Sequence, residues 1–242
     1  MTRVEPIRSI QPVTSARRVL IMAEMHGRDL LRRHAALALL VALPLAFYLS
    51  SASQGKSSVA AGGIGMAFAV SGATLFSVLS SEAVDQRLVL GGYRPFELLL
   101  GRLMFLGPLG LVVAALFTVL MALVSHPERP WVLGLGVGVV ALQSVPFGLA
   151  VGAALARELE GTLVLIGVIG IQMAVSPDST VAKVLPFYGP RRLIASALAP
   201  EGPILGPLTQ TLIYALVLLL IARRFIAHRV DVRHHASTLP ED

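Results

Sequence analysis

The chain has 242 residues, of which 55% are hydrophobic and only 14% are charged, whereas about 25% of residues are charged in a typical soluble domain. With a mean hydropathy of +0.76, this composition excludes a soluble globular domain, a disordered chain and a collagen-like repeat. The absence of cysteine excludes disulfides, thiolate nucleophiles and cysteine-bound metals. The net charge is +6, and in a membrane protein such cations set orientation in the bilayer, so we expect no nucleic-acid partner.

Residues 1–34 predict a cytosolic tail followed by an amphipathic helix over 14–34. At helical spacing, one side of this helix is mainly apolar and the other carries charges. The apolar side holds Val19, Met22, Ala23, His26 and Leu30, and the charged side holds Arg17, Glu24, Arg28 and Arg32. This pattern favours a helix that lies along the membrane surface over a solvated helical extension.

Six apolar segments within residues 35–226 predict an all-α, polytopic membrane protein with six transmembrane helices. These segments are 35–51, 59–80, 96–124, 131–156, 161–175 and 208–226. A polar segment, 81–95, separates the second from the third. A segment with six prolines, 176–207, separates the fifth from the sixth, and a basic tail, 227–242, follows the last.

The distribution of cations predicts the orientation. If both termini are cytosolic, fifteen of the 20 Lys and Arg residues fall inside and five fall outside. The outside set is Lys56, Arg129, Lys183, Arg191 and Arg192. Because cytosolic loops of membrane proteins are enriched in Lys and Arg, this bias predicts a multi-pass cell-membrane protein with both termini in the cytosol.

The predicted spans carry few groups that could perform chemistry. No Asp or Glu lies near the middle of a span, and Arg102 stands close enough to a span end for its guanidinium to reach the interface. Ionisable residues within spans mark proton and ion pathways, so their scarcity disfavours an ion-coupled transporter. Intramembrane proteolysis is disfavoured too, because the spans contain no protease motif.

Two short patterns resemble ligand sites without meeting their requirements. Gly55-Lys56-Ser57 matches the end of a phosphate-binding loop, but Ser50 stands where that loop requires glycine. His234-His235 lies in the basic tail and lacks a full set of metal ligands. We therefore expect no nucleotide, metal or other cofactor on this chain, no enzymatic activity, and an energy source on another chain.

The polar segment 81–95 predicts a short cytosolic helix. Glu82, Asp85, Gln86 and Val89 share one helical face by i, i+3, i+4 spacing. Gly91-Gly92 then ends the helix, and Arg94-Pro95 starts the next segment. Such a helix could transmit motion from a cytosolic partner to the spans, whereas the alternative is a plain solvated loop.

Two stretches of the chain resemble ABC-2-type transporter permeases. The first is Glu82-Ala83-Val84-Asp85-Gln86-Arg87 followed by Pro95-Phe96-Glu97-Leu98-Leu99-Leu100-Gly101-Arg102, which is similar to the coupling helix and leucine-rich third span of that family. The second is Leu185-Pro186-Phe187-Tyr188-Gly189-Pro190, which resembles the extracellular stretch before the family's sixth span. The amphipathic helix over 14–34 is similar to the family's connecting helix.

The resemblance implies an ABCG-like exporter, in which two permease chains form the pathway and a separate ABC ATPase binds ATP and magnesium below them. It assigns ATPase coupling to Glu82, Asp85, Gln86, Arg87, Arg94, Arg157, Glu158 and Glu160. It places the pathway at spans two and five, where the candidate residues are Ser71, Thr74, Ser77 and Gln172. It places an extracellular gate at Pro186, Phe187 and Tyr188.

Three alternatives stay open at this point. Small and hydroxyl residues of spans two and five serve helix packing as readily as they line a pathway. A non-transporting membrane anchor or scaffold for a cytosolic protein would show the same spans. A haem-export-type permease has a similar size, but no His or Met pair is convincingly placed in a span. A pathway without fixed charge predicts an amphipathic or hydrophobic substrate, such as a drug, an antibiotic or a lipid-like molecule.

Overall fold

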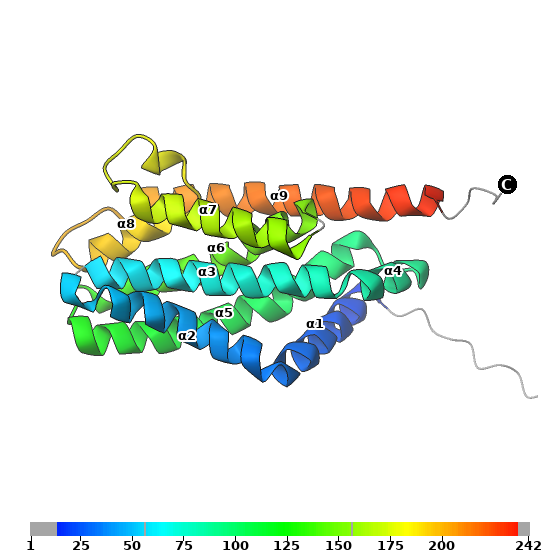
Figure 1. The fold of residues 1–242 in the computed structure, drawn as a ribbon, viewed down its shortest axis with the longest axis horizontal. Coiled ribbons are helices and arrows are strands. Elements are labelled where there is room, and N and C mark those ends of the chain that lie inside the picture. The colour runs from blue at the N-terminus through cyan, green and yellow to red at the C-terminus, as the bar shows by residue number, and fades with distance from the viewer. Residues whose placement is uncertain (1–13, 56, 156, 237–242) are drawn as a thin grey trace, which may run out of the picture.

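The computed structural model describes residues 14–55, 57–155 and 157–236, and these ranges are helical without any strand. The described residues do not include Lys56, Ala156 or the outermost tails, 1–13 and 237–242. The predictions made for these parts of the chain therefore lie outside the described structure. The helices that run along the long axis of the molecule (Figure 1) are α2 (His34–Ser50), α3 (Ser57–Ser80), α5 (Pro95–Ser125), α6 (Pro130–Ala154), α7 (Glu158–Ala174) and α9 (Leu205–Ala236). Shorter elements join them: α1 (Ser15–Arg32), α4 (Glu82–Leu90), α8 (Tyr188–Ala197) and the 3-10 turns η1 (Ala52–Gln54) and η2 (Ala182–Val184).

Four helices are long and apolar enough to cross a membrane, namely α3, α5, α6 and the Leu205–His228 part of α9. A fifth candidate arises if α1 and α2, which meet at an 81° bend, form one broken span. Helices α2 and α7 have 17 residues each, or about 25 Å of helix, which is short of a hydrocarbon core of about 30 Å. By length and composition, the described chain is thus a helical membrane protein with four to five candidate spans, fewer than the six predicted.

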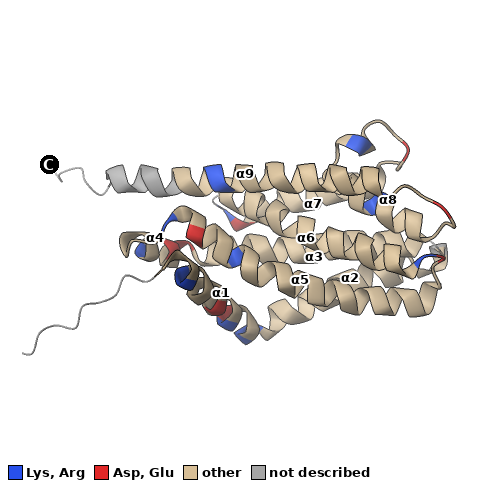
Figure 2. Cartoon of the chain, turned by 180° about the vertical axis from the view of Figure 1, so that it is seen from behind, with Lys and Arg blue, Asp and Glu red and all other residues tan. Residues whose placement is uncertain are grey.

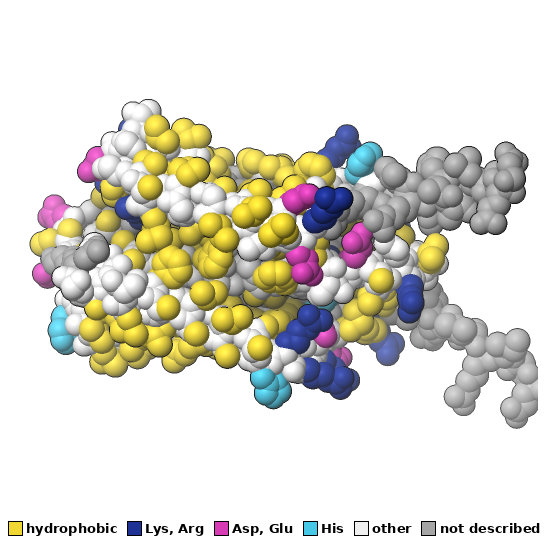
Figure 3. Space-filling view, in the orientation of Figure 1, with side chains coloured by type: hydrophobic (Ala, Val, Ile, Leu, Met, Phe, Trp, Pro, Cys, Tyr) yellow, Lys and Arg dark blue, Asp and Glu magenta, His cyan; other side chains and the backbone are white. Residues whose placement is uncertain are grey.

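The ends and the sides of the molecule differ in chemistry. Charged residues cluster near the two ends of the helices, while the helical shafts between them are almost free of charge (Figure 2). On the face seen in Figure 3, apolar side chains are spread along the length of the molecule between these ends. Helix α4 and the C-terminal part of α9 lie at one end of the molecule, and η1 and α8 lie at the other (Figure 1). This distribution is what a bilayer requires, because charge is costly in hydrocarbon and tolerated at the interfaces.

Helix α6 forms the centre of the packing, in contact with α3, α5, α8 and α9. Buried residues make up 72% of the apolar stretch of α3 and of α6, against 17% for α9. Because α9 buries so little of its apolar surface within the chain, that surface is available to lipid or to another protein. Gly148 and Gly152 on α6 bring its backbone close to α3, since an added Cβ at either position would meet atoms of α3 at 3.0 Å or less. Such small residues allow close approach of helices where the hydrophobic effect does not drive association.

The predicted amphipathic helix extends from Ser15 to Arg32, and the chain turns at Arg33. Its apolar side, with Val19 and Met22 buried, packs on α5. Gly101 permits this contact, because a Cβ there would lie 2.6 Å from the Met22 Cβ. The apolar stripe therefore covers another helix of the same chain. Exposed Leu20 and other apolar residues remain on the outer side of α1.

Candidate functional site

Helix α4 has nine residues, with Ser81 immediately before it and Gly91-Gly92 immediately after it. Its C-cap is Gly91, and Gly92 follows with a φ of 88°, a conformation that glycine adopts readily. Pro95 stands at the first position of α5, where a missing N–H costs nothing. The Glu97 carboxylate accepts a 2.9 Å hydrogen bond from the Arg94 backbone N–H, so α5 begins immediately after the break.

A buried ion pair attaches α4 to α5. Arg102 is completely buried, and its Nη2 lies 2.5 Å from the Asp85 Oδ2 on α4. The same Nη2 donates a 2.5 Å hydrogen bond to the Ser81 hydroxyl, which in turn donates to the Ser77 carbonyl at 2.7 Å. Charge-assisted bonds of this kind are among the strong ones in proteins, so α4 and the start of α5 are tied together.

This geometry corrects one expectation and refines another. Arg102 does not extend to the interface, because Asp85 and Ser81 satisfy its guanidinium inside the protein. Asp85 and Gln86 lie on neighbouring positions of α4 as predicted, but Asp85 is half-buried against Arg102 while Gln86 is exposed. Burial raises the pKa of Asp85, and the positive charge of Arg102 opposes that rise.

Arg18 makes a second connection, between α1 and the α4–α5 break. Its Nη1 donates a 2.7 Å hydrogen bond to the Gly92 carbonyl and lies 3.7 Å from the Glu97 carboxylate. Its guanidinium also lies 5.3 Å from the centre of the Tyr93 ring, within the range of a cation–π contact. Sequence patterns did not indicate these partners, because Arg18 and Gly92 are 74 residues apart.

Three more of the predicted coupling residues lie at the chain turn before α7 or in its first turn. Arg157 and Glu160 are exposed and form an ion pair at 3.4 Å. Glu158 is exposed as well, but it lines a pocket described below. Arg94 is exposed at the start of α5. None of these residues joins the buried pair of Arg102.

The predicted pathway residues separate into two environments. Ser71 and Thr74 are fully buried, and their hydroxyls donate to the Ala67 and Val70 carbonyls of their own helix. They face Gly148 of α6, where they make the close helix contact. Ser77 instead lines the pocket.

Gln172 is also fully buried, and both its side-chain amide atoms lack a hydrogen-bond partner in the described part of the chain. Its backbone carbonyl accepts a 2.7 Å bond from the Arg191 Nη1, which also reaches the Val175 carbonyl at 3.0 Å. Arg191 thus satisfies carbonyls that the end of α7 leaves free. Burial lowers the pKa of Arg191 from its usual value.

The predicted gate residues form a buried junction at the opposite end from α4. The Phe187 ring is buried and meets the Phe147 ring edge-on at 5.4 Å between centres. The Pro186 carbonyl accepts a hydrogen bond from the Gln143 Nε2 of α6. Tyr188 begins α8 and is half-buried. Phe187 and Pro186 therefore fix the segment before α8 onto α6.

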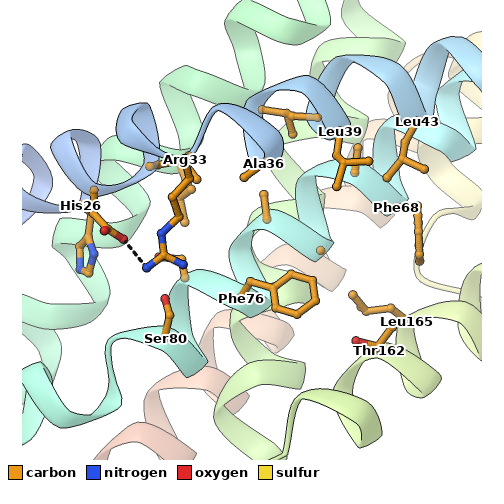
Figure 4. Close-up of a pocket in the computed structure, with 18 of the residues that line it drawn as sticks. His26, Arg33, Ala36, Leu39, Leu43, Phe68, Phe76, Ser80, Thr162 and Leu165 are labelled. Carbon is orange, nitrogen blue, oxygen red and sulfur yellow. Dashed lines mark ion pairs between the residues drawn. The ribbon is translucent and has the colours of Figure 1, made fainter.

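A pocket of about 400 Å³ lies where α1 and α2 bend apart, and we call it the elbow pocket. Side chains of α1, α2, α3 and α7 surround it (Figure 4), together with Phe105 and Leu106 of α5. Its α1 side carries His26 and the ion pair of Asp29 with Arg33, at 3.0 Å. Sequence reasoning missed this pocket, because it depends on the 81° bend between two helices.

Comparison with models of known families and with curated protein sequences gave no match. Within the part of the chain that the structure describes, no three His, Asp or Glu side chains are grouped so that they could hold a metal ion. The candidate site therefore has two parts. One is the set of charged contacts that links α1, α4 and α5, and the other is the elbow pocket, whose wall is partly polar and partly apolar.

Proposed function

We propose that this chain is the membrane subunit of an ATP-driven exporter, moved by a separate ABC ATPase that binds the end carrying α4. The observation that supports the proposal most directly is the buried pair of Asp85 with Arg102, which joins a short exposed helix to a long apolar one. The resemblance of 82–102 to the coupling region of ABC-2-type permeases points to the same role. The second ATPase contact in this proposal is the turn with Arg157 and Glu160.

The mechanism we propose is rigid transmission of motion. A partner that pushes or rotates α4 would move α5 with it, because stretching the Arg102 contact would leave a buried charge without its partner. The same displacement would reach α1 through Arg18 and the Gly92 carbonyl. The outer face of α4, with exposed Gln86 and Arg87, is left free for the partner.

In this proposal the chain crosses the bilayer six times, with α2 and α7 as the two short crossings. A helix shorter than the hydrocarbon core is accommodated by local thinning of the bilayer or by association with neighbouring helices. A second permease chain would complete the pathway, and the end with α4 would face the cytosol. The substrate would be an amphipathic or hydrophobic molecule that leaves the cell.

Cysteine labelling tests this orientation on a natural background without cysteine. Ser53 in η1 and Gln86 in α4 are both exposed and lie at opposite ends. In intact cells, Ser53→Cys is expected to react with a membrane-impermeant maleimide and Gln86→Cys only after permeabilisation. The reverse pattern would invert the proposed topology, and equal labelling from outside would exclude it.

Co-purification tests the proposed partner. A tagged copy of the chain, purified from its own cells, is expected to retain an ATPase, while the chain alone hydrolyses no ATP. Arg87→Glu is expected to reduce the retained ATPase about tenfold, because reversing one exposed charge at an interface costs on the order of 1–2 kcal/mol. Val84→Asn, which changes an exposed residue on the same helix without altering charge, is the control. Retention of a non-ATPase regulator in place of the ATPase would favour the scaffold alternative.

A further inference from the structure

The elbow pocket changes in character along its length. Ser80 and Phe68, both on α3 and both in its wall, are twelve residues apart, or about 18 Å along the helix. The end near Ser80 carries the polar and charged groups, because His26 and the Asp29–Arg33 ion pair lie beside Ser80 (Figure 4). Glu158 also lines the pocket and begins α7 three residues before Gly161, which lies against Leu75 in the last turns of α3. Toward Phe68 the wall is apolar, with Leu43 from α2 as one example. A pocket of this size and gradient suits an organic molecule with one polar side.

The charged groups of the wall leave one carboxylate in excess. The Asp29 carboxylate is neutralised by Arg33 at 3.0 Å. Glu158 lines the same end of the pocket, and no ion pair is recorded for it in the described chain. Burial favours the neutral form of His26, so the imidazole adds no cation that would cancel Glu158. Among the charged residues that line the pocket, the Asp29–Arg33 pair is neutral and Glu158 contributes one negative charge in excess.

The interior of the pocket offers further contacts to a cation. Phe68, Phe76 and Phe105 contribute aromatic rings to the wall, and aromatic faces attract organic cations. His26 is 7% exposed, and its Nε2 has no hydrogen-bond partner. A buried polar atom without a partner at the wall of a cavity is a group that a ligand could satisfy.

We infer that the elbow pocket binds a lipophilic organic cation, with its positive charge near Glu158 and its apolar body among the phenylalanines. The claim that such a cation is the exported substrate rests on the proposed function. The claim that it binds in the elbow pocket concerns this chain alone. Charge complementarity favours an organic cation over the acyl chain of a neutral lipid, which would not need the carboxylate.

The test measures equilibrium binding to the purified full chain in zwitterionic lipid nanodiscs, without ATPase, after subtraction of empty nanodiscs. The probes are tetraphenylphosphonium and its isosteric anion tetraphenylborate. We expect the cation to bind at least about tenfold more tightly than the anion. Glu158→Gln is expected to weaken cation binding about threefold to fivefold, as for loss of one partly exposed charge pair. Glu128→Gln, which removes an exposed carboxylate outside the pocket, is expected to have no effect.

A filling variant tests the location. Gly72 lines the pocket, and an added Cβ there meets no atom within 4 Å. Gly72→Leu is therefore expected to fold and to reduce cation binding at least about tenfold by occupying the cavity. Gly167→Leu is the matched control, because Gly167 has equally open surroundings and lies outside the pocket.

Equal binding of the two probes, or no effect of Glu158→Gln, would overturn the charge preference and leave an apolar cavity for lipid. Unchanged cation binding in Gly72→Leu would exclude this pocket. A change of oligomeric state in Gly72→Leu would identify the pocket as an interface between copies and would also overturn the inference. The assay contains no ATPase, so cation binding could be demonstrated even if the chain proved not to be an exporter. Failure of cation binding would likewise leave the exporter proposal standing.

Discussion

Asp85→Asn is expected to lower the free energy of unfolding by about 3 kcal/mol, because it leaves the buried guanidinium of Arg102 without a counter-charge. The asparagine side chain has nearly the same size and can still accept a hydrogen bond, so the change removes charge and little else. The Asp85 side chain is 19% exposed and that of Arg102 only 1%, so solvent screens the pair weakly. Chemical unfolding in detergent micelles, followed by circular dichroism, would measure the change.

A control on the same helix separates the ion pair from the helix itself. Arg87 is exposed on α4 and is not a member of the buried Asp85–Arg102 pair. Arg87→Gln is expected to change the free energy of unfolding by less than about 0.5 kcal/mol, as is usual for surface substitutions. Equal effects of Asp85→Asn and Arg87→Gln would show that the ion pair contributes nothing to stability.

The double variant Asp85→Leu with Arg102→Leu extends the test. Replacing both members of a buried ion pair with apolar residues is often neutral or stabilising, whereas removing one member is costly. We therefore expect the double variant to recover at least about 1.5 kcal/mol relative to Asp85→Leu alone. If α4 transmits motion through this pair, the double variant would fold and bind the ATPase but export poorly. Recovery of stability together with full export would show that the pair serves stability alone.

The positions of the helices could be predicted from the sequence, because each apolar stretch is bounded by a strong local signal. Gly91-Gly92 and Arg94-Pro95 bound α4, since glycine favours the conformation that ends a helix and proline favours the first turn of the next. The break at Arg33 carried no such signal, and the helix predicted over 14–34 ends two residues earlier, at Arg32. Helices α2 and α7, with 17 residues each, are close in length to the apolar segments predicted for them, 35–51 and 161–175.

The contacts of the charged residues could not be predicted. Asp85 and Arg102 are 17 residues apart across a helix break, and helical spacing relates residues only within one helix. Spacing placed Asp85 and Gln86 on one face of the helix but could not show which of them is buried, and Asp85 is the one that meets the buried charge of Arg102. The elbow pocket depends on the angle between α1 and α2, which no sequence pattern encodes. The sequence left undecided whether Ser71 and Thr74 line a pathway or serve helix packing, and the structure places both in the contact between α3 and α6.

Gly148→Ala is expected to destabilise the protein by about 2–3 kcal/mol, because the added methyl group has no room between α6 and α3. Its Cβ would overlap the Ser71 carbonyl oxygen and lie 2.7 Å from the Thr74 Cβ. A carbonyl oxygen within a helix cannot move aside as the end of a flexible side chain can. The two helices would have to separate, which costs about 1–3 kcal/mol in a well-packed core.

Gly138→Ala supplies the matched control on the same helix. There an added Cβ meets only the Leu111 Cδ2, at 3.7 Å, which is an ordinary contact. Alanine also has a higher helix propensity than glycine by up to about 1 kcal/mol, so this variant is expected to be neutral or slightly more stable. The free energies of unfolding of both variants in the same detergent give the comparison.

The difference between the two glycine variants also bears on the pathway. If Gly148→Ala is costly and Gly138→Ala is not, α3 and α6 touch backbone to backbone at Ser71, and no substrate passes between them there. Ser71→Ala would then leave export unchanged, while substitutions at Ser77, which lines the elbow pocket, would alter it. Equal stabilities of the two glycine variants would instead mean that α3 and α6 stand further apart, and the space between them would again be a candidate for the pathway.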